Sequence, residues 1–101
     1  MTSAPRQSLP PDVEAWITKN FRPADAGLAR ASLEMAVDHK GELVNARLLR
    51  CAAVASRGEL ERLHLLVEEL KKDWRDVIVA GEYDYVNEKS VRIRDLTRPI
   101  E

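Results

Sequence analysis

The chain has 101 residues, which favours one small domain. Its 16 basic and 17 acidic side chains nearly cancel, and 45% of the residues are apolar. These values exclude a membrane protein, a collagen, a disulfide scaffold and a highly charged disordered chain, and they argue against a strongly basic nucleic-acid binder. A single cysteine, Cys51, cannot form an internal disulfide, and residues 1–11 lack a signal-peptide pattern. We therefore expect a cytoplasmic protein with no membrane segment.

The first half of the chain predicts three helices. Residues 1–9 are expected to be a flexible tail. Prolines at positions 10 and 11 then open a helix that ends before Pro23, because a proline pushes its preceding residue out of the helical region. A second helix is expected from about Ala24 to the basic residues before Gly41, which resembles a helix C-terminus. A third, the most buried, is expected over residues 42–55.

The second half predicts one long helical stripe with a break. Ser56 and Glu59 have the spacing of a capping box. Apolar residues then recur every three or four positions as far as Gly81. Asp73, followed three positions later by an acid, predicts an interruption and a new helix start. A set of large apolar side chains is expected to be buried together: Leu48, Leu60, Leu63, Val67, Leu70 and Trp74.

After Asp84 the pattern alternates with a period of two, as in a strand. Residues 87–89 could turn a hairpin, but an extended arm is favoured because an isolated hairpin is barely stable in water. The predicted fold is all-α: a small four- to five-helix bundle over residues 10–84, with an extended C-terminal arm over residues 85–101.

No group of residues predicts catalysis, a metal or a cofactor. The Glu61–His64 spacing of di-iron bundles occurs only once. Cys51 lies on an apolar helix face, which indicates a buried structural thiol rather than a nucleophile. Most carboxylates, Glu82 among them, fit a solvated, ion-paired helix face. We therefore expect a protein that is not an enzyme.

The candidate residues are all for interaction. Leu65 and Val79 lie opposite the main apolar stripe, so something is expected to cover them: the C-terminal arm of the same chain, or a second copy in a homodimer. In the segment that begins at Asp73, Trp74 is expected to anchor the core. The alternative is a ligand groove. The full set of candidates is Leu65, Arg75, Val79, Glu82, Arg92, Arg94 and Arg98.

These features favour a non-enzymatic module for protein interaction or self-association. The alternative is a nucleic-acid-associated regulator that uses the three C-terminal arginines. A loose helix-turn-helix around residues 47–60 is disfavoured, because the helix after the turn begins with acids that would repel phosphate.

The segment from Arg47 to Tyr83 resembles a group of short bacterial helical proteins. The likeness rests on Gly-Glu-Leu-Glu-Arg-Leu at 58–63 and on Asp-Trp-Arg-Asp-Val at 73–77. The resemblance implies a bacterial origin and a helical fold, and it implies no activity, cofactor or catalytic residue.

Overall fold

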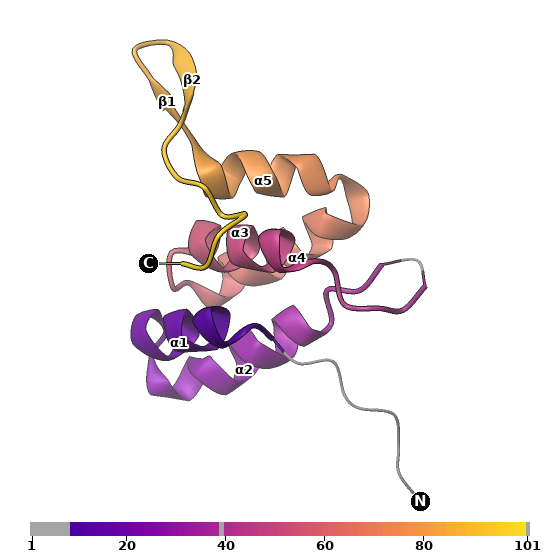
Figure 1. The fold of residues 1–101 in the computed structure, drawn as a ribbon. Helices are drawn as coiled ribbons and strands as arrows, with labels where there is room; N and C mark the ends of the chain where they lie inside the picture. The colour runs from indigo at the N-terminus through magenta and orange to yellow at the C-terminus, as the bar shows by residue number, and fades with distance from the viewer. Residues whose placement is uncertain (1–8, 39, 101) are drawn as a thin grey trace, which may run out of the picture.

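A computed structural model describes residues 9–38 and 40–100, so the predicted tail lies mostly outside the described residues. The fold is mostly helical with one hairpin near the C-terminus, which confirms the helical class (Figure 1). The elements in chain order are α1 Pro11–Asn20, α2 Pro23–Glu34, α3 Ala46–Ser56, α4 Leu60–Lys72, α5 Trp74–Glu82, β1 Tyr83–Val86 and β2 Lys89–Arg92. Among the described residues, no helix combines the length and apolarity needed to cross a bilayer.

Both N-terminal helices begin at a proline, as predicted for the first. Pro11 and Pro23 occupy first-turn positions, where a missing N–H costs nothing. Val13 and Ile17 of α1 are fully buried against the core. Leu9, assigned to the flexible tail, is also buried, so the ordered core begins before α1.

The second helix ends earlier than expected, at Glu34 rather than near Gly41. Beyond it, the Asp38 carboxylate accepts hydrogen bonds from the N–H groups of Lys40 and Glu42, which holds a turn in place of a helix. The third helix consequently begins at Ala46, where the side chain of Asn45 caps the N–H of Leu48 at 3.0 Å.

The capping box predicted at Ser56 and Glu59 is wrong. The Ser56 hydroxyl donates to the carbonyl of Ala53 and accepts from the N–H of Gly58, so it ends α3 instead of starting α4. Gly58 has φ +78°, and a Cβ there would collide with the backbone carbonyl of Asn20. Glycine is therefore required at this turn, because it satisfies both the left-handed conformation and the close approach.

The predicted break at Asp73 is confirmed. Asp73 ends α4 and accepts a hydrogen bond from the N–H of Arg75 at 3.1 Å, which caps α5. The break changes the register of the stripe, and Trp74 is 51% exposed instead of anchoring the core. Leu60 is only partly buried. The other members of the predicted cluster are buried: Leu48, Leu63, Val67 and Leu70.

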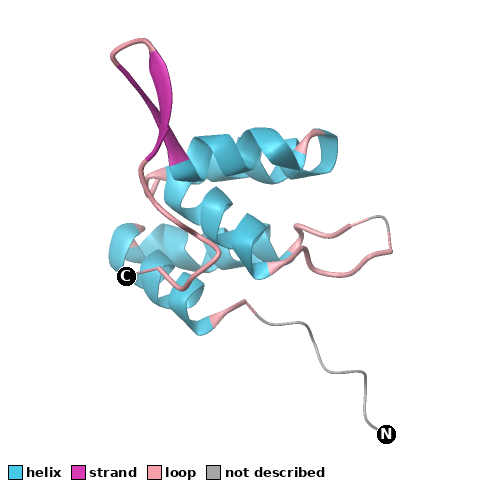
Figure 2. Ribbon diagram, turned by 45° about the horizontal axis from the view of Figure 1, so that its top comes forward, coloured by secondary structure: helices cyan, strands magenta, loops and turns pink. Residues whose placement is uncertain are grey.

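The chain after α5 forms a hairpin where an extended arm was favoured. Tyr83 pairs with Arg92 and Val86 with Lys89 across a two-residue turn at Asn87 and Glu88. Both turn residues have positive φ, 50° and 63°, as a tight hairpin turn requires. The hairpin projects away from the helices (Figure 2). Residues 93–100, which we call the strap, then return along the helices without regular structure.

Candidate functional site

The α5–hairpin junction contains a fully buried carboxylate. Glu82, the last residue of α5, accepts hydrogen bonds from Nε and Nη2 of Arg47 on α3, at 2.8 and 2.9 Å. Arg92 of β2 donates to it at 3.1 Å, and the N–H of Leu96 in the strap donates at 3.2 Å. One carboxylate therefore joins α3, α5, β2 and the strap. The expected solvated position of Glu82 is wrong, because both of its arginine partners come from other elements.

The charges around Glu82 set the protonation of its neighbours. Hydrogen bonds from Arg47 outweigh the cost of burial and lower the pKa of Glu82. Burial, together with the nearby Glu82 charge, raises the pKa of the Cys51 thiol to about 12. Cys51 is fully buried, as predicted, and its protonated thiol is not a nucleophile at neutral pH.

A second, partly buried ion pair joins α3 to α1 at the point where the end of the strap is bound. Arg50 of α3 donates to the Asp12 carboxylate of α1 at 2.9 Å, and the N–H of Ile100 donates to the same oxygen at 3.0 Å. Arg50 also reaches the carbonyls of Leu96 and Thr97. Burial raises the pKa of Asp12, but the hydrogen bonds from Ile100 and Arg50 lower it more, so it stays below its usual value. The two carboxylates of Glu82 and Asp12 therefore both bind backbone N–H groups of the strap.

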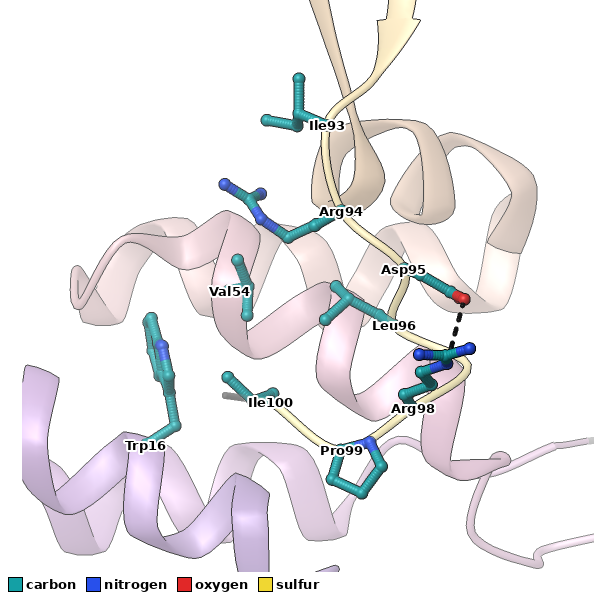
Figure 3. A pocket seen from close by; sticks show the side chains of 9 residues that line it. All are labelled: Trp16, Val54, Ile93, Arg94, Asp95, Leu96, Arg98, Pro99 and Ile100. Carbon is teal, nitrogen blue, oxygen red and sulfur yellow. Dashed lines mark ion pairs between the residues drawn. The ribbon is translucent and has the colours of Figure 1, made fainter.

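A pocket of about 480 Å³ opens beside the strap (Figure 3). Trp16 of α1 and Val54 of α3 form one wall, and strap residues form the other. Arg94 lines it and donates a 2.6 Å hydrogen bond to the carbonyl of Gly81. Within residues 9–38 and 40–100, no three His, Cys, Asp or Glu side chains are grouped to hold a metal ion.

The structure separates the residues that the sequence placed together. Arg75 is exposed and pairs with Asp73 at the start of α5, whereas Glu82 is buried at the other end of the same helix, so the structure does not bring these two candidates together. Leu65 and Val79 are 71% and 51% exposed, so the strap does not cover them within the chain.

The C-terminal arginines are partly neutralised. Arg92 pairs with both Glu82 and Asp95, and Arg98 pairs with Asp95 at 3.8 Å. Arg47, the nearest arginine on α3, is bound to Glu82 as well. Arg92 and Arg98 therefore lie against acids, whereas Arg94 bonds to the carbonyl of Gly81, so the three C-terminal arginines do not present one unpaired basic patch, which weighs against the nucleic-acid alternative.

Sequence reasoning missed several functional contacts. The sequence alone indicates no ion pair for Arg47, Arg50 or Asp12. The available signal was the presence of two arginines on a helix that is otherwise apolar and expected to be buried. Comparison with protein-family models, curated proteins and solved structures found no match.

Proposed function

We propose that the protein is a non-enzymatic module that associates with a second copy of itself through the β-hairpin. The supporting observation is the exposure of the hairpin: every strand residue except Tyr83 is exposed, including Tyr85 at 70%. A two-stranded hairpin alone in water is marginally stable. A second copy that extends the sheet would supply the missing hydrogen bonds and cover the apolar side chains.

The hairpin register identifies the available edge. Val86 and Lys89 close the turn and bond to each other, so the backbone groups of Tyr83 and Tyr85 are directed outward from β1. The N–H of Tyr85 indeed bonds to the side chain of Asp84 and not to β2.

Two-fold pairing of β1 about Tyr85 is compatible with its charges. Asp84 would lie opposite Val86 of the second copy, so no like charges face each other. On one side, the resulting four-stranded sheet would carry Val86, Val91 and Ile93, each 43–46% exposed, together with Asp84 and Lys89. A sheet of four strands is more stable in water than an isolated two-stranded hairpin.

Light scattering at micromolar concentration tests the proposal, and the unchanged chain is expected to have about twice the 11.4 kDa monomer mass. Tyr85→Pro removes the outward N–H without removing a bond between β1 and β2, so it is expected to give a monomer. Tyr85→Thr is the matched control, since it keeps the N–H and a strand-forming side chain and should still dimerise.

Leu65→Lys separates this interface from one on the helices. Because Leu65 is exposed, the substitution should leave the fold intact, and the dimer should persist. A monomeric unchanged chain would refute self-association, and a dimer lost with Leu65→Lys but kept with Tyr85→Pro would move the interface to α4.

A further inference from the structure

The pocket beside the strap combines apolar walls with the dimensions of a ligand site. Trp16 and Val54 come from α1 and α3, while Ile93, Leu96 and Ile100 come from the strap. Its volume of about 480 Å³ lies within the range of small-molecule sites. Segments far apart in the sequence build it, so it exists only when the strap is in place (Figure 3).

Arg94 gives this pocket an uncompensated positive charge. Within residues 9–38 and 40–100, no carboxylate lies within ion-pair distance of its guanidinium, and its bond to the Gly81 carbonyl fixes its position. The acid that lines the pocket, Asp95, is already paired with Arg92 and Arg98. In Figure 3, Arg94 reaches toward the Trp16 side, whereas Arg98 and Asp95 face each other on the opposite side of the strap.

We propose that this pocket binds a small apolar monocarboxylate. The carboxylate would accept hydrogen bonds from the free N–H groups of Arg94, whose planar fork matches its two oxygens. The aliphatic or aromatic body of the ligand would lie on Trp16, Val54 and Ile100. A neutral ligand of the same shape would leave the guanidinium uncompensated, and a cation would be repelled.

The probe for the test is 3-phenylpropanoate, with its neutral amide as the comparison. In a Trp74→Phe background Trp16 is the sole indole, so its fluorescence reports the pocket directly. We expect a saturable change with the acid and at least tenfold weaker binding of the amide. Because both compounds are tested on the same protein variant, a difference in binding does not come from a difference in folding. Equal binding of the two, or no saturation with the acid up to about 10 mM, overturns the proposal.

Two arginine variants then locate the charge. Arg94→Gln is expected to weaken binding of the acid at least tenfold, while Arg75→Gln, the control at an exposed arginine that does not line the pocket, should keep it within twofold. Circular dichroism checks that both fold. The reverse ranking overturns the assignment to Arg94. Because the pocket lies within one chain, Tyr85→Pro should bind the acid unchanged, which separates this proposal from the proposed self-association.

Discussion

Glu82 is a charged residue whose side chain is fully buried, where a charge destabilises the fold unless it is compensated. Taking one carboxylate out of water costs several kcal/mol unless opposite charges and hydrogen bonds offset it. Here two guanidinium groups and a backbone N–H supply that compensation, and the arginine side chains of Arg47 and Arg92 remain 36% and 42% exposed. Solvent therefore screens part of the attraction.

Glu82→Gln tests this compensation. The pKa of Glu82 is lowered in the folded state, so its charge stabilises the fold above the unfolded value, about 4.5, and that stability is lost as the pH falls through the folded pKa. We expect the variant to lose about 2–3 kcal/mol at pH 7, an amount discounted for the exposed arginines, and less below pH ~4.5. Urea unfolding at several pH values measures this. Glu61→Gln, on an exposed surface, should be neutral, and a pH-independent loss at Glu82 would contradict the explanation.

At the scale of the elements, Gly81 allows α5 to approach the backbone of α3 closely. A Cβ at Gly81 would lie 2.7 Å from the Cα of Cys51, in backbone that cannot move aside as a side chain can. Glycine is therefore what allows Glu82, the next residue, to come within reach of Arg47.

Gly81→Ala is expected to destabilise the protein by about 1–3 kcal/mol through overpacking. Gly27→Ala is the matched control, because α2 leaves open space there and alanine favours a helix by about 0.5–1 kcal/mol. Thermal unfolding compares the two. If both substitutions raised the melting temperature, α3 and α5 would not be in close backbone contact at Gly81.

Local signals identified the elements better than their ends or contacts. The break at Asp73 was predictable because a helix cap is a local interaction: the Asp73 side chain bonds to the N–H of Arg75, only two residues away. Trp74 was misplaced because the stripe was continued across that break in one register. The Ser56 hydroxyl was misassigned because it could serve either the end of one helix or the start of the next.

The site was less predictable, since its partners are distant in sequence. Arg47 and Glu82 are separated by 35 residues, and no periodic pattern in the sequence pairs an arginine of one helix with a glutamate of another. The pocket depends on the return path of the strap, and no local pattern specifies where an irregular segment lies. For the preceding segment, the low stability of an isolated hairpin favoured an extended arm, whereas Asn87 and Glu88 adopt positive φ and turn the chain back.

At the scale of the whole molecule, the strap connects the end of α5 with α1 through its bonds to Glu82 and Asp12. Its one deeply buried side chain is Leu96, 3% exposed, whose N–H also bonds to Glu82. The strap thereby lies against α1 and α3 and closes one side of the core.

Leu96→Ala is expected to cost about 2–4 kcal/mol, as for other buried leucines, and to lower the melting temperature by roughly 10 °C or more. Leu65→Ala removes the same atoms from a side chain that is 71% exposed and should change stability by less than about 0.5 kcal/mol. Calorimetry on both variants is the measurement. Similar losses would mean that the strap contributes little to the core.

The bond between Asp12 and the N–H of Ile100 spans 88 residues. Closing so long a loop in an unfolded chain carries an entropic cost of about 4 kcal/mol that grows with its length. Prior packing of the helices between the two residues shortens the distance that remains to be closed. On a translating ribosome, α1 is made long before its partner in the strap. The Asp12 carboxylate can pair with Arg50 of α3 first, and the N–H of Ile100 can reach it only after the strap has been made, so the pocket forms after the helices.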